Sequence, residues 1–168
     1  SSDRIEISTT SNTQTHGVLS GDIGGDLYIA SMDTAVYVHD LVVTGDANIL
    51  ALTDILDGED PSTDTIERQA DGTGFDLKAG TITITLDQDA SVGAMNNYVE
   101  IDSTSTTDGL RITTVSSDSD AENSVSIAEL YGDLLIDGIH TGASGFANLR
   151  SNASILEQKR SGNTDTNI

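Results

Sequence analysis

The groups in this chain best suited to bind a ligand are carboxylates in the stretch DSDAENSVSIAE. Four of them occupy positions 1, 3, 5 and 12 of a calcium-binding loop: Asp118, Asp120, Glu122 and Glu129. Hard oxygen ligands at alternate positions are what Ca²⁺ coordination requires. At position 6, however, Asn123 replaces the usual glycine, and strands flank the loop instead of helices. The stretch predicts a weak calcium site, and an acidic turn that leads into the next strand is the favoured interpretation.

Other groups that could do chemistry are few. The stretch GDIGGDLYI resembles a single calcium-binding nonapeptide, but its Asp26 recurs as Asp133 in a second Gly-Asp-Leu segment, which favours a structural role. Asp57, Glu59 and Asp60 could imitate a catalytic carboxylate pair, and a solvated loop is the favoured interpretation. With three scattered histidines, no cysteine and no nucleophile or phosphate motif, we predict no enzyme, no catalytic residue and no cofactor apart from calcium.

Composition narrows the classes of partner. The 28 acidic and 7 basic residues give a formal net charge of -21, which disfavours nucleic acid and anionic membranes as ligands. Only 4% of the 168 residues are aromatic, and there is no tryptophan. Aliphatic residues must therefore build the core, and thin, regular layers suit them better than a bulky globule does.

The apolar residues alternate with polar ones, which predicts strands. In TITITLD, Ile82, Ile84 and Leu86 share one face and threonines share the other. The same alternation pairs further residues: Val99 with Ile101, Leu110 with Ile112, and Val125 with Ile127. Turn-forming stretches rich in Gly, Asp and Ser separate these runs, and no long amphipathic helix is evident, so the pattern predicts an all-β fold.

Three pairs of segments repeat in the same order. They begin at Arg4 and Tyr98, at Gly25 and Gly132, and at Thr44 and Ser144. We therefore predict one elongated β-solenoid segment: the end of one unit (1–24), a full unit (25–131) and the start of the next (132–168). With turns of roughly 20 residues, matched segments should occupy equivalent positions in one stack. A tandem β-sandwich adhesin domain of immunoglobulin type is the alternative fold.

Several of these segments carry a resemblance to a known family. Gly25–Ile29 (GDLYI), Asp54–Asp57 (DILD), TITIT, SVGAMNN and VEIDS appear in the order seen in repeats of large bacterial exoproteins similar to filamentous haemagglutinin. The resemblance covers most of residues 25–157 and rests on structural motifs. It implies a right-handed parallel β-helix, secretion across a Gram-negative envelope, and a role in adhesion or in building a biofilm matrix.

Together these observations predict a non-catalytic structural or adhesive shaft segment of a large secreted or cell-surface bacterial protein. A calcium-stiffened adhesin repeat and a self-assembling extracellular filament subunit are the alternatives. The expected partners are neighbouring repeats of the same protein, further copies of the chain, or a host surface or matrix polysaccharide, with no nucleic acid and no membrane insertion.

Overall fold

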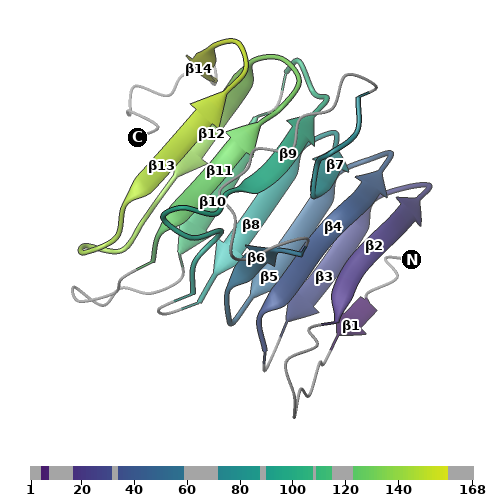
Figure 1. Cartoon of the computed structure of the whole chain (residues 1–168), viewed down its shortest axis with the longest axis horizontal. Helices are drawn as coiled ribbons and strands as arrows, with labels where there is room; N and C mark the ends of the chain where they lie inside the picture. The colour runs from purple at the N-terminus through teal and green to yellow at the C-terminus, as the bar shows by residue number, and fades with distance from the viewer. Residues whose placement is uncertain are drawn as a thin grey trace.

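The structure is a computed structural model, and it describes residues 5–7, 17–31, 34–58, 72–87, 90–107, 109–114 and 123–158. Over these ranges the chain forms strands and turns and no helix, which confirms the all-β prediction. All pairings between the named strands are parallel, and the strands form two sheets that face each other (Figure 1). Immunoglobulin-type sandwiches consist of antiparallel strands, so that alternative is wrong for the described part of the chain.

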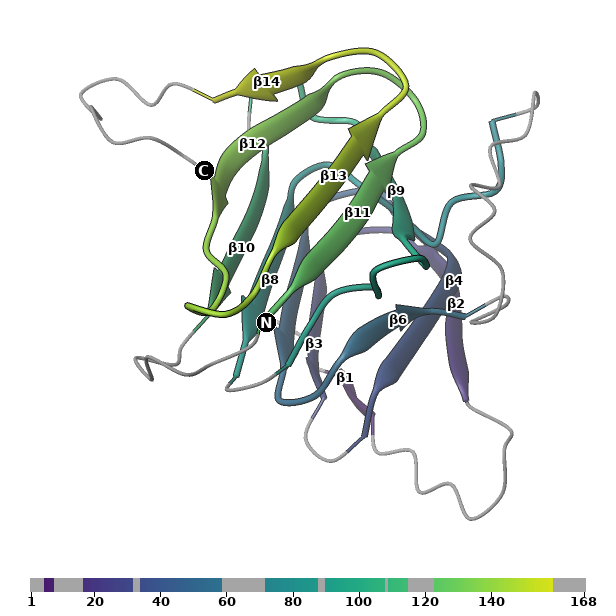
Figure 2. The same cartoon turned by 60° about the vertical axis from the view of Figure 1, so that its left-hand side comes forward.

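Each sheet grows in one direction as the chain advances, which Figure 2 shows from a second side. Sheet A contains, in spatial order, β1 (Ile5–Ile7), β3 (Leu27–Ser31), β5 (Ala47–Ala51), β8 (Ile82–Leu86), β10 (Leu110–Thr114), β12 (Leu134–Ile139) and β14 (Ile155–Glu157). Sheet B contains β2 (Val18–Ile23), β4 (Val36–Val43), β7 (Leu77–Ala79), β9 (Val99–Ser103), β11 (Val125–Glu129) and β13 (Ala147–Ser151), with β6 (Ile55–Asp57) paired to β4. Apart from β6 and β7, successive strands alternate between the sheets, so the chain makes repeated circuits.

Aspartates at the corner before sheet A join one circuit to the next. The Oδ1 atom of Asp26 accepts a hydrogen bond from the backbone N–H of Asp46, 20 residues later, at 3.0 Å. The Oδ1 atom of Asp46 accepts one from the N–H of Thr81, 35 residues later, at the same distance. Asp133 bonds the N–H of Ser154 in the same way. Asp26 thus has a structural role, and circuits vary in length instead of keeping to roughly 20 residues.

The core between the sheets consists of aliphatic side chains from both. Ile82, Ile84 and Leu86 are at most 2% exposed, whereas Thr83 and Thr85 between them are only half-buried. The three other predicted pairs, Val99 with Ile101, Leu110 with Ile112 and Val125 with Ile127, also belong to this core. The predicted inward faces are therefore confirmed.

The repeated segments do not all occupy equivalent strands. Leu27 and Leu134, from one matched pair, both begin strands of sheet A. Ala47 and Ala147, from the Thr44 and Ser144 pair, begin strands of sheet A and sheet B respectively. The expectation that this pair marks equivalent positions was wrong. Strands of both sheets need the same alternating aliphatic pattern, so the pattern does not specify the sheet.

Candidate functional site

Only one of the four predicted calcium ligands lies in the described part of the chain. Asp118, Asp120 and Glu122 fall outside it. Glu129 ends β11, is 1% exposed, and accepts hydrogen bonds from the N–H and Oγ of Ser103 at 3.1 and 2.6 Å. The backbone N–H of Tyr131 donates to its other carboxylate oxygen at 3.3 Å. Burial raises the pKa of Glu129 to about 7, and these hydrogen bonds oppose the rise.

A different set of carboxylates comes together around sheet B. Asp57 ends β6, Asp76 immediately precedes β7, and Glu100 lies in β9. We call these three residues the carboxyl cluster; each offers an oxygen within 4.8 Å of the other two. All three are buried, with 8%, 3% and 5% of their surfaces exposed. The solvated-loop interpretation was therefore wrong for Asp57, while Glu59 and Asp60 lie outside the described residues.

Asp76 is the electrostatic centre of the carboxyl cluster. Burial raises the pKa of Asp76 to about 10, and the negative charge of Asp57 adds to the rise. A hydrogen bond of 2.9 Å from the N–H of Glu100 to Asp76 Oδ2 lowers the pKa in part. His39 approaches from β4, with its Nδ1 3.9 Å from Asp76 Oδ1. Asp76 is thus protonated at neutral pH, which limits the negative charge in the cluster.

A second, smaller apolar cluster lies along sheet B. Four buried residues form it: Phe75, Tyr98, Ala128 and Leu130. Two cations lie over its rings, with Arg150 4.3 Å from the centre of Tyr98 and Lys78 5.5 Å from the centre of Phe75. Lys78 also forms an ion pair with the buried Asp102. The ion pair balances the charge of Asp102, which lies two residues after Glu100 in β9.

The carboxyl cluster can hold a proton or supply oxygen ligands to a cation. Three carboxylate oxygens within 4.8 Å are a partial ligand set for Ca²⁺, which takes six to eight oxygens. Sequence reasoning missed Asp76 and Glu100. A usable signal was present, because each acid sits beside an aromatic or aliphatic neighbour in FDLK and YVEID, at a strand position that alternation places away from the main core.

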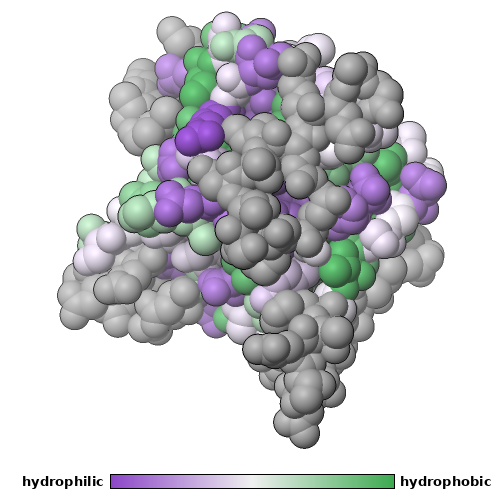
Figure 3. All heavy atoms as spheres, viewed as in Figure 1, coloured by the Kyte–Doolittle hydropathy of each residue, from purple (hydrophilic) through white to green (hydrophobic). Residues whose placement is uncertain are grey.

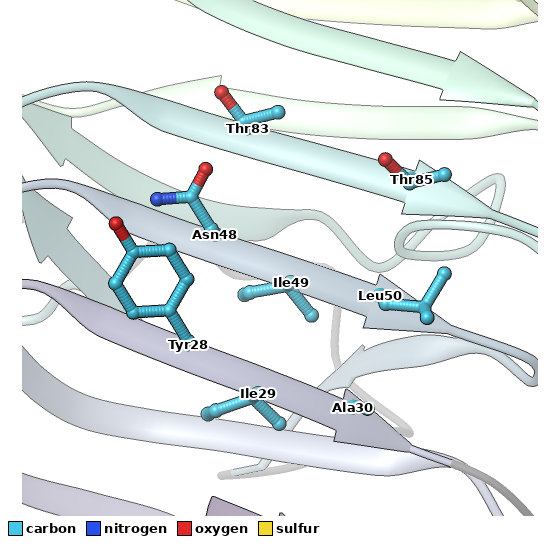
Figure 4. Close-up of a pocket in the computed structure, with 8 residues that line it drawn as sticks. All are labelled: Tyr28, Ile29, Ala30, Asn48, Ile49, Leu50, Thr83 and Thr85. Carbon is cyan, nitrogen blue, oxygen red and sulfur yellow. The ribbon is translucent and has the colours of Figure 1, made fainter. Parts of the chain in front are cut away.

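A second candidate is a shallow groove on the outer face of sheet A, with a volume of about 260 Å³. Tyr28, Asn48 and Thr83 lie side by side on β3, β5 and β8, as the strand register requires. Figure 4 shows their side chains projecting from the same side of the sheet, opposite to Ile49. We call this surface the Tyr28 groove. Tyr28 is 39% exposed, so its ring is accessible to solvent.

The face of the molecule seen in Figure 3, on the side of sheet B, is mixed in character. On the face shown in Figure 3, hydrophilic residues are interspersed with smaller hydrophobic groups. Among the described residues there is no helix with the length and apolar character needed to cross a membrane.

Comparison with known proteins identifies no relative. No family model, no curated protein and no solved structure matches this chain. The fold and the two candidate sites therefore have to be interpreted from their own geometry.

Proposed function

We propose that this chain is a segment of a right-handed parallel β-helix that serves as a non-catalytic structural and adhesive shaft. The observation that carries the proposal is the repeated alternation of strands between two all-parallel sheets. Such stacking lengthens in one direction with every circuit, which is how a shaft is built. Right-handedness is supported by the strong preference of parallel strand-crossover-strand connections for that hand.

The outermost strands support continuation of the stack. Val18 in β2 is 42% exposed, and Ile155 and Leu156 in β14 are 45% and 41% exposed. Leu134 in β12, the register partner of Ile155, is 0% exposed, whereas Tyr37 and Leu135, the partners of Val18 and Leu156, are half-buried. Strand edges with exposed apolar residues pair readily with further strands. We infer that neighbouring repeats of the same parent protein, or another copy of the chain, cover these edges.

The proposed setting follows from the acidic surface and from the resemblance to haemagglutinin-like exoproteins. A net charge of -21 favours solubility and disfavours contact with nucleic acid. The resemblance suggests a host surface or a matrix polysaccharide as the partner. We place the parent protein outside the cell or on its surface. The calcium-stiffened alternative stays a prediction, since a shared proton also accounts for the carboxyl cluster.

Mechanical extension of single molecules tests the shaft. With the two ends tethered in an optical trap, we expect stepwise lengthening as circuits detach in turn. Circuits of 20 and 35 residues should release roughly 70 and 120 Å, at about 3.5 Å for each extended residue. Smooth extension without resolved steps would show that the circuits do not resist load, and the shaft proposal would fail.

A further inference from the structure

The Tyr28 groove crosses three neighbouring strands of sheet A. Tyr28, Asn48 and Thr83 form one row across β3, β5 and β8, and Ala30, Leu50 and Thr85 form a second row in the same register. Adjacent strands lie about 4.8 Å apart, so each row runs along the stacking direction for about 10 Å. An elongated ligand that follows the shaft would therefore contact successive strands through the same face.

The chemistry of the groove is that of a surface for neutral, hydroxyl-rich molecules. The exposed Tyr28 ring supplies a flat apolar face, and Leu50, 36% exposed, extends it. The Asn48 amide offers both donors and an acceptor, and the hydroxyl of Thr83 can do either. Apolar surface combined with a few convergent polar groups is typical of small-molecule sites.

Charge indicates which class of ligand the Tyr28 groove favours. None of the groove's lining residues carries a charge at neutral pH, although the chain as a whole carries -21. Arg111 follows Thr83 in the row, and its guanidinium is paired with Asp137 at 3.1 Å. A polyanion would be repelled by the surrounding protein, and a second copy would bring a further charge of -21 against this face. A neutral polyol is not repelled by the charge of the protein.

We propose that the Tyr28 groove binds a short stretch of a neutral glycan, with one sugar ring stacked on Tyr28 and its hydroxyls bonded to Asn48 and Thr83. This inference deepens the proposed adhesive role and rests on it, because a shaft presents the outer face of sheet A along its length. The groove would give that shaft a specific ligand class.

Isothermal titration calorimetry of the full chain with neutral hexasaccharides tests the proposal. The probes are cellohexaose, chitohexaose and maltohexaose, with hexagalacturonate as the charged comparison. We expect saturable binding of at least one neutral probe below about 10 mM and weaker binding of hexagalacturonate. Absence of saturation by all three neutral probes, or preferential binding of hexagalacturonate, would overturn the inference.

Three variants locate the binding. Tyr28→Ala should weaken the Kd by about tenfold through loss of the ring, while Tyr28→Phe should change it by less than about threefold. Tyr37→Ala is the matched control, because Tyr37 lies half-buried in β4 of sheet B. Circular dichroism establishes that each variant is folded. An unchanged Kd in Tyr28→Ala would overturn the assignment to this groove.

Failure of this inference is distinguishable from failure of the shaft proposal. If the optical trap shows stepwise unfolding but no glycan binds, the glycan inference is wrong and the shaft proposal stands. Smooth extension together with Tyr28-dependent binding would remove the shaft and leave a glycan-binding surface.

Discussion

Asp76→Asn tests the electrostatics of the carboxyl cluster. The raised pKa of Asp76 means that the folded state keeps its proton up to about pH 10, whereas the unfolded chain loses it near 3.8. Below pH 3.8 Asp76 is protonated in both the folded and the unfolded state, so it adds no pH dependence to the free energy of unfolding. Above it the unfolded state binds fewer protons, so the free energy of unfolding falls as the pH rises towards 10.

The size of the effect follows from the same values. Each pH unit inside this window lowers the free energy of unfolding by up to 1.36 kcal/mol, so between about pH 7.5 and pH 9 the native chain should lose about 2 kcal/mol. Glu129, whose pKa is raised from 4.5 to about 7, changes the free energy of unfolding between pH 4.5 and 7, so its effect lies below this range. Asp76→Asn should abolish the decline and raise the free energy of unfolding at pH 7.5 by about 2 to 5 kcal/mol.

The assay is urea unfolding followed by far-UV circular dichroism at several pH values, with a chelator present. Asp133→Asn is the matched control, because Asp133 is exposed and its replacement keeps an oxygen that can accept from the N–H of Ser154. The control should retain the decline between pH 7.5 and 9. Either of two results would refute the reasoning. The first is a free energy of unfolding of the native chain that stays flat or rises over this range. The second is an Asp76→Asn variant that is less stable than the native chain at pH 7.5.

Three further predictions concern packing and calcium. Gly45→Ala should destabilise the chain by about 2 kcal/mol, because the new Cβ would lie 2.2 Å from Asp26 Oδ1. The control Gly24→Ala, whose Cβ would have nothing within 4 Å, should cost under about 1 kcal/mol. Equal losses of stability in thermal melts would contradict this account of the corner. Ile84→Ala should lower the free energy of unfolding in urea by about 3 kcal/mol, since Ile84 is 2% exposed. Thr85 is half-buried, so Thr85→Ala should cost under about 1 kcal/mol. Similar values for the two variants would mean that the inward and outward faces are not as described. If calcium stiffens the chain, thermal melts should show a higher midpoint with the ion than with chelator, and an unchanged midpoint would remove that alternative.

The expected calcium residues show where sequence reasoning met its limit. Spacing within DSDAENSVSIAE could suggest a loop, but the environment of Glu129 depends on Ser103, 26 residues earlier. In the same way, the carboxyl cluster joins Asp76 to Glu100, 24 residues later, through a hydrogen bond between neighbouring strands. Local spacing carries no information about such pairs, because their distance depends on how many residues each circuit contains.

For the clearly alternating runs, such as TITITLD, the sequence by itself determined that they are strands and which face enters the core, since alternation is a local property with a period of two residues. Only the tertiary structure decided which sheet each strand joins, as Ala47 and Ala147 show by lying in different sheets. The same stacking buried Asp57 beside Asp76 and aligned Tyr28 with Asn48. Both outcomes depend on circuits of unequal length coming into register, and that register is set by contacts between strands rather than by neighbouring residues.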